Sequence, residues 1–102
     1  MTDYAAPQFL VHEPGDVVAV AVEEIEPGLA RGAVLASDED FTAEVREHIP
    51  LGHKFALSDL AENAPVIEYG VQIGVATSAI AQGAYVHTHN VRSARWQNSV
   101  AN

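Results

Sequence analysis

Apolar residues along the chain occur in short runs that are separated by turn-forming residues such as Glu13-Pro14-Gly15-Asp16. The runs predict strands over residues 9–12, 17–22, 31–36, 53–57, 65–69, 71–77 and 84–89, whereas residues 41–45 fit either a strand or a helical turn. In the second run Val18, Val20 and Val22 alternate onto one face. Short strands at this spacing predict an all-β fold.

Two stretches interrupt the strands with a different pattern. Residues 58–62 and 78–81 each begin with a serine that can cap a helix, so we expect one or two short helical turns there. These stretches also belong to an internal repeat, because residues 58–66 align with residues 78–86 at a constant offset. Each copy has a serine, an apolar anchor, a turn residue that tolerates positive φ (Asn63 or Gly83) and a strand. Residues 25–28 resemble a third copy, which ordinary turn chemistry also explains.

Glycine inside one predicted strand marks a further local feature. Gly74 interrupts the run over residues 71–77, which indicates a β-bulge or a close approach of another backbone segment.

Composition limits the classes of protein to consider. A chain of 102 residues with 48% apolar residues predicts one globular domain, here residues 9–92, with a flexible leader over residues 1–8 and a tail over residues 93–102. The absence of cysteine excludes disulfides and thiolate chemistry. A net charge of −9 argues against nucleic-acid binding. No apolar run is long enough to cross a membrane and the start lacks signal-peptide features, so we expect a cytoplasmic protein.

The charge is distributed unevenly between the two halves of the chain. Residues 1–50 carry eleven acidic residues against two arginines, and residues 51–102 carry three acidic against three basic residues. If the protein handles an anion, the second half is therefore the expected place. The alternative is that the first half is simply a solvated acidic surface.

His87-Thr88-His89-Asn90 is the first candidate for site chemistry. Side chains two apart in a strand share a face, so His87 and His89 can converge on a metal ion or an anionic ligand, with the Asn90 amide beside them. A metal needs a further ligand, and the candidates are His53, His12, Glu13 and Glu68. The alternative is a pair of exposed histidines without a ligand.

Three further segments carry candidate residues. After the turn at residues 49–52, His53 can transfer protons near neutral pH, and Lys54, the only lysine, can bind a carboxylate or sulfonate; the alternative is a solvated turn. Tyr69 offers a phenol before Gly70, or else packs as an ordinary aromatic residue. The remaining candidates lie near the end of the chain and are Arg92, Arg95 and Trp96. They can clamp an anion or contact a partner chain, and the alternative is a disordered tail.

These segments carry a family resemblance. Residues 49–60, 65–70, 73–74 and 86–91 resemble the small SAF-type domain of the altronate/galactarate dehydratase family, and residues 9–16 are similar in particular to the small subunit of its sulfolactate sulfo-lyase branch. The resemblance covers residues 9–96. Two positions depart from the family pattern: Glu68 stands where lysine is common, and Asn63 stands where glycine is usual.

The resemblance implies a small SAF, or β-clip, fold that forms the lesser part of a lyase. Such enzymes eliminate water or sulfite from a hydroxy acid, and the larger part is a separate chain or a C-terminal domain. The implied cofactor is ferrous iron or another divalent metal, held mainly with the large partner. The implied residues are His53 and Lys54 for catalysis, His87 and His89 for the metal, and Asn90, Tyr69 and Arg92 for the small anionic substrate.

Two alternatives to a lyase subunit stay open. The chain can be a non-catalytic SAF-type binding module for a sugar acid or a partner protein. It can also be an oligomerisation domain that assembles with copies of itself into a homo-oligomer, in which case the histidines are incidental.

Overall fold

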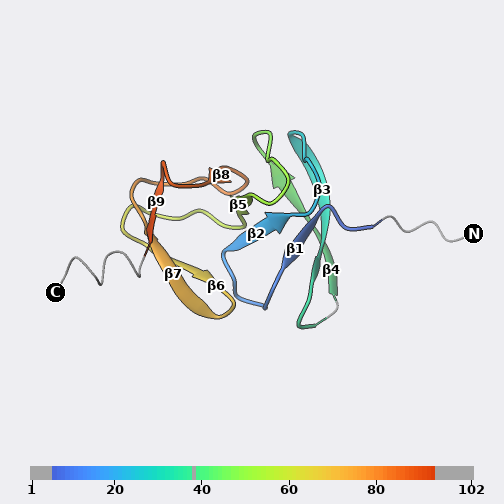
Figure 1. Ribbon diagram of the computed structural model, residues 1–102, viewed down its shortest axis with the longest axis horizontal. Helices are drawn as coiled ribbons and strands as arrows, with labels where there is room; N and C mark the ends of the chain where they lie inside the picture. Colours follow the sequence, from blue (N-terminus) through green and yellow to red (C-terminus); the bar gives the residue numbers. More distant parts are fainter. Residues whose placement is uncertain (1–5, 38, 94–102) are drawn as a thin grey trace, which may run out of the picture.

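The computed structural model of the chain describes residues 6–37 and 39–93, and all regular structure within these residues is β-strand (Figure 1). The strands are β1 (Phe9–Val11), β2 (Val18–Ala21), β3 (Gly28–Val34), β4 (Glu39–Val45), β5 (Lys54–Ala56), β6 (Pro65–Glu68), β7 (Val71–Ala76), β8 (Tyr85–Val86) and β9 (Val91–Ser93). Residues 1–5 of the expected leader and residues 94–102 of the expected tail lie outside the described residues. The all-β prediction is confirmed, and residues 41–45 are strand. Among the described residues there is no helix of the length and hydropathy that would cross a membrane.

The strands form two sheets that lie side by side along the long axis of the molecule (Figure 1). The larger sheet has the order β4-β3-β1-β2-β5-β8, and the smaller has the order β6-β7-β9. Neighbouring strands are antiparallel except for β1 and β3, which are parallel. Strand β8 is one edge of the large sheet, and β5 lies between β2 and β8.

Each half of the molecule has its own apolar core. In the first, the ring of Phe9 packs edge-on against Phe41 and Phe55 at centroid distances of 5.4 and 5.0 Å. The second is centred on aliphatic residues from β2, β5, β6 and β7. Strand β2 serves both cores, since Ala19 and Ala21 belong to the first and Val18 to the second. The predicted face of Val18, Val20 and Val22 is therefore buried only at Val18, and Val22 is 40% exposed.

The internal repeat is confirmed as a structural unit. Leu60 and Ile80 form an isolated antiparallel bridge in which each N–H donates to the other's carbonyl at 2.8 Å. Three residues after each anchor the chain turns with positive φ, at Asn63 (73°) and at Gly83 (89°). A Cβ at Gly83 would stand 2.3 Å from the Glu44 carbonyl oxygen, so the second copy requires glycine where the first accepts asparagine.

The expected helical turns do not form. The backbone groups of Leu60 and Ile80 bond to each other across the bridge and are therefore not available for bonds along a helix. Residues 58–62 and 78–81 are bends and turns around that bridge.

A second bridge of the same kind joins Ile25 to Ile49, with mutual N–H···O bonds of 3.0 and 2.9 Å. The looser third copy at residues 25–28 is thus part of a real unit, and its partner is the turn at residues 49–52, which the sequence pattern marks only as a break. Gly52 donates to the Ala21 carbonyl at 2.8 Å, as Gly83 donates to the Ala56 carbonyl at 2.7 Å. A bridge followed by a glycine turn therefore precedes both His53 and β8.

The prediction for Gly74 is confirmed. The β6–β7 pairing shifts register between Val66 and Ile67, which is a β-bulge or a related irregularity. A Cβ at Gly74 would stand 2.6 Å from the Arg92 carbonyl oxygen, so the glycine lets β9 approach β7. Strand β9 is not among the strands that the sequence pattern predicts.

Candidate functional site

A cleft of about 340 Å³ opens between the edge of the large sheet and the small sheet. Three candidate residues, His53, Lys54 and His87, line it. The rest of the lining is apolar or small: Gly52, Val66, Ile73, Val86, Thr88, Val91 and Ser93. The fold therefore brings together two segments, at residues 53–54 and 87–88, that are separate in the sequence.

The turn at residues 49–52 delivers His53 and Lys54 to the cleft. The N–H of His53 donates to the Pro50 carbonyl at 3.0 Å, and its carbonyl accepts from Ala21 at 2.8 Å. Lys54 is the first residue of β5 and pairs with Val20 on one side and Val86 on the other. Both backbones are thus fixed, and His53 is half-buried.

The segment His87–Asn90 is a turn and not the end of a strand, because β8 stops at Val86. The Asn90 side chain builds this turn: its Oδ1 accepts from the N–H of His87 at 2.9 Å, and its Nδ2 donates to the Tyr85 carbonyl at 2.8 Å. Asn90 is 7% exposed. The structure accordingly uses this amide to shape the turn, and its role toward a substrate stays a prediction.

Aromatic packing, rather than strand alternation, gathers the imidazoles. The rings of His53 and His87 are 5.0 Å apart. Tyr85, which the sequence analysis did not single out, stacks on His87 at 5.6 Å and lies 5.7 Å from His89. Its hydroxyl is 2.5 Å from Nδ1 of His53. The available signal was its position two residues before His87.

A buried carboxylate contacts Lys54, one of the residues that line the cleft. Glu68 is 5% exposed, and its oxygens lie 3.8 Å from the Lys54 Nζ and 3.4 Å from the His12 Nε2. Tyr69 is 58% exposed and stacks on His12 with a ring distance of 3.7 Å. Glu68 and His12, both candidates for a further ligand beside His87 and His89, thus contact each other, and Glu68 also contacts Lys54.

Asp16 holds this region in place and was recognised in the sequence only as part of a turn. It is 7% exposed, and its carboxylate accepts from the backbone N–H groups of Glu13, Tyr69 and Gly70 at 3.2, 3.0 and 3.1 Å. Tyr69 has a φ of 60°, an unusual conformation for a residue with a side chain. The Asp16 bonds offset the cost of that conformation.

The basic residues near the end of the chain lie elsewhere. Arg92 is exposed on β9, where it pairs with Val75, and it is not among the residues that line the cleft. Arg95 and Trp96 lie outside the described residues.

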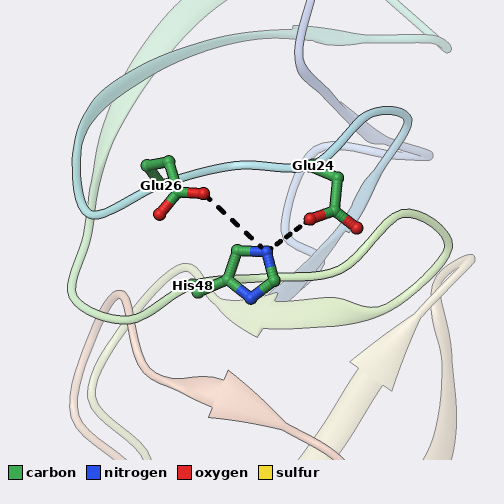
Figure 2. Close-up of side chains that lie close together, drawn as sticks. All are labelled: Glu24, Glu26 and His48. Carbon is green, nitrogen blue, oxygen red and sulfur yellow. Dashed lines mark hydrogen bonds and ion pairs between the residues drawn. The ribbon is translucent and has the colours of Figure 1, made fainter.

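One three-residue cluster of metal-ligand type exists in the described part of the chain, and it is not a predicted one. Glu24, Glu26 and His48 place one ligand atom each within 4.8 Å of one another. Figure 2 shows the His48 Nε2 directed at both carboxylates, at 2.5 Å from Glu24 and 3.9 Å from Glu26. Their hydrogen bond lowers the pKa of Glu24 and raises the pKa of His48. All three side chains are exposed, and none lines the cleft.

His87 and His89 belong to no such three-residue group within residues 6–37 and 39–93. A protein-bound zinc or iron ion takes three or more protein ligands in most sites.

The amino-acid sequence is similar to a described protein family and to several known proteins. Residues 7–94 match the family described as the altronate/galactarate dehydratase SAF domain. The chain is 46% identical over 90 residues to subunit alpha of (2R)-sulfolactate sulfo-lyase from Chromohalobacter salexigens, with 86% of this chain and 96% of that subunit covered. It is 45% identical over 78 residues to altronate dehydratase from Escherichia coli, of which it covers only 15%. The subunit alpha from Paracoccus pantotrophus is 38% identical over 63 residues.

Proposed function

Because the chain belongs to the altronate/galactarate dehydratase SAF domain family, we propose that it is the small subunit of a hydroxy-acid lyase whose cleft forms one wall of an active site. The observation that carries the proposal is the cleft at which His53, Lys54 and His87 meet. The cleft is open and the chain is short, so a large partner chain supplies the opposite wall.

The difference in coverage supports a separate partner. The chain spans 96% of a sulfo-lyase subunit named alpha but 15% of an altronate dehydratase. The remaining 85% of the dehydratase has no counterpart in this chain. We propose that a second polypeptide provides the equivalent part, and that elimination of sulfite from sulfolactate is the first reaction to test, with dehydration of sugar acids the second.

The residues of the cleft fit the chemistry of such an elimination. The reaction removes a proton α to a carboxylate and expels a leaving group from the neighbouring carbon. Lys54 carries the positive charge that binds a carboxylate or sulfonate, and His53 stands next to it at the cleft wall. Tyr69, Asn90 and Arg92 are proposed as further substrate contacts once the partner is in place.

His87 and His89 are the proposed contribution to a divalent metal site, with ferrous iron as the first candidate. Both imidazoles stand on the exposed turn at the end of β8, where a partner chain can add ligands. When bound, the ion stabilises the enolate-like negative charge that develops during elimination.

Reconstitution tests the proposal. The chain is co-purified from its native host, and the complex is assayed with sulfolactate for sulfite release and with altronate and galactarate for dehydration. We expect turnover of one of these substrates only when both chains are present. If no large lyase co-purifies with the chain and none of these substrates is turned over, the result would instead support a non-catalytic binding module.

A matched pair of variants tests the metal ligands in the same complex. Replacing His87 and His89 by alanine is expected to lower both the turnover and the bound metal by about ten-fold or more. His48→Ala removes an imidazole that does not line the cleft and is expected to leave turnover unchanged. Unchanged turnover and metal content in the double variant would show that the two histidines are incidental.

A further inference from the structure

Tyr85 is the residue of the cleft region whose role neither the family resemblance nor the motif spacing assigns. Its hydroxyl oxygen lies 2.5 Å from the His53 Nδ1, within hydrogen-bond distance. Both side chains are half-buried. The contact joins the residue opposite Phe55 on β8 to the residue immediately before β5.

We propose that Tyr85 is a positioning residue that donates its phenolic hydrogen to the His53 Nδ1, so that neutral His53 carries its hydrogen on Nε2 and offers it to an anion in the cleft. This inference rests on the proposed function, because it assumes that the cleft receives the carboxylate or sulfonate of a hydroxy acid. It assigns His53 the role of a hydrogen-bond donor in place of a base.

The direction of the hydrogen bond follows from the chemistry of the two groups. An unprotonated imidazole nitrogen is a strong acceptor, and a phenol is a better donor than acceptor because its oxygen lone pair is delocalised into the ring. Among the described residues, the hydrogen-bond partner of the Tyr85 hydroxyl is His53. The reverse direction would leave the phenolic hydrogen without a protein partner in this region.

The backbone on both sides fixes the pair. The Tyr85 N–H donates to the Glu47 carboxylate at 3.0 Å, and its carbonyl accepts from the Asn90 side chain at 2.8 Å. The Tyr85 ring stacks almost parallel on His87, with an interplanar angle of 7°. With Tyr85 held in this way, the orientation of the His53 ring is set by the contact at Nδ1.

The consequence is that two residues of the cleft lining, His53 and Lys54, can donate hydrogen bonds to one ligand. With Nδ1 occupied, Nε2 is the nitrogen that His53 has left for a ligand, and Lys54 lines the same cleft. Part of the Lys54 charge is already balanced by the buried Glu68 at 3.8 Å. A neutral donor and a partly balanced ammonium in one cleft suit an anion with several acceptor oxygens, which is the chemistry of a carboxylate or a sulfonate.

Imidazole nitrogen NMR of the full-length chain tests the hydrogen bond directly. At a pH where histidine is neutral, about 8, we expect an acceptor-type Nδ1 signal and a protonated Nε2 signal for His53. Tyr85→Phe keeps the stacked ring and removes only the hydroxyl, so the His53 Nδ1 signal moves toward that of a nitrogen without a donor. Tyr69→Phe removes an exposed phenolic hydroxyl and leaves the His53 signals in place. A hydrogen on Nδ1 in the unmodified protein, or an unchanged spectrum in Tyr85→Phe, would overturn the inference.

Kinetics of the reconstituted complex test the role of His53. Tyr85→Phe is expected to raise KM by roughly two- to ten-fold, with a smaller effect on kcat, because the variant loses one hydrogen bond. His53→Gln retains a donor but cannot accept a proton at neutral pH, so it keeps most of kcat if His53 is a donor. A fall in kcat of about 100-fold or more in His53→Gln would show that His53 is a base and overturn the assignment. The NMR result requires no turnover, so a complex without lyase activity would remove the proposed function and leave the hydrogen bond standing.

Discussion

Two regions of this molecule place histidine close to carboxylate groups, and they differ in how the side chains are held. In the cleft region, Glu68 is 5% exposed and contacts both Lys54 and His12, while His53 is bonded to Tyr85. In the cluster of Glu24, Glu26 and His48, the side chains are 63%, 77% and 46% exposed. Burial and fixed partners, not the mere proximity of imidazole and carboxylate, distinguish the cleft region from the exposed cluster.

The difference arises from the fold. The bridged residues Ile25 and Ile49 are buried, and they are flanked by Glu24, Glu26 and His48. The turn that begins at Ile49 leads to His53, so the same bridge precedes both regions. Residues on either side of a bridged residue point away from it, so the cluster is displayed to solvent. Beyond residue 52 the chain enters β5 between β2 and β8, and its side chains meet the second sheet. The same backbone unit thus yields an exposed cluster on one side and a lined cleft on the other.

Removal of the cleft charge is expected to have the largest effect. Lys54→Met keeps the aliphatic stem and removes the ammonium, and we expect kcat/KM of the reconstituted complex to fall by about 100-fold or more. Glu26→Gln removes a charge from the exposed cluster and is the matched control, with activity expected to stay as it is. Equal activities of the two variants would remove the distinction between the regions.

The buried carboxylate gives the next largest effect, on stability. Glu68→Gln keeps the size of the side chain but leaves the Lys54 ammonium without its counter-charge at a position where the Glu68 side chain is 7% exposed. We expect the free energy of unfolding to fall by about 1–3 kcal/mol, measured by urea denaturation. The same change at an exposed position, Glu24→Gln, should leave the urea midpoint almost unchanged. Equal shifts for both variants would contradict the role given to burial.

Much of the fold could be predicted from local pattern. Most strand positions, the repeat with its offset of twenty residues and the close approach at Gly74 follow from apolar runs, alternation and turn chemistry, but β4 was left undecided and β9 was not predicted. The helical turns were wrong because a capping serine reports a local preference, whereas the bridge of Leu60 and Ile80 is a contact between distant residues. The end of β8 was placed too late because the Asn90 side chain closes a turn that alternation does not reveal.

The site was predicted less completely than the fold. His53, Lys54 and His87 were singled out by residue type and by the family resemblance, and the structure brings them to one cleft. Tyr85, Asp16 and the link between Glu68 and His12 were missed as positioning contacts, since they join residues 32, 53 and 56 positions apart. Contacts of that kind depend on how strands pair, which a single sequence does not state.

The smallest predicted effect concerns the pH response of the exposed cluster. The hydrogen bond between Glu24 and His48 raises the pKa of His48 above its ordinary value of 6.5 and lowers the pKa of Glu24 below 4.5. The His48 contribution to stability is therefore present below pH 6.5 and is lost as the pH rises through the raised pKa. The Glu24 contribution is present above pH 4.5 and is lost as the pH falls through the lowered pKa. Both groups are charged between these limits, so the pair is strongest there.

An NMR titration of the His48 ring measures this coupling. Glu24→Gln should return the His48 pKa toward 6.5, and Glu26→Gln should lower it by less, because Glu26 acts through charge alone at 3.9 Å. Added salt should reduce the shift in the unmodified protein, since the exposed pair is screened by solvent ions. A His48 pKa that is the same in all three proteins would show that the cluster does not form as drawn. A His48 pKa shift that does not change with salt would mean that the cluster is shielded from solvent. The difference in burial between the cluster and the cleft region would then be smaller than proposed.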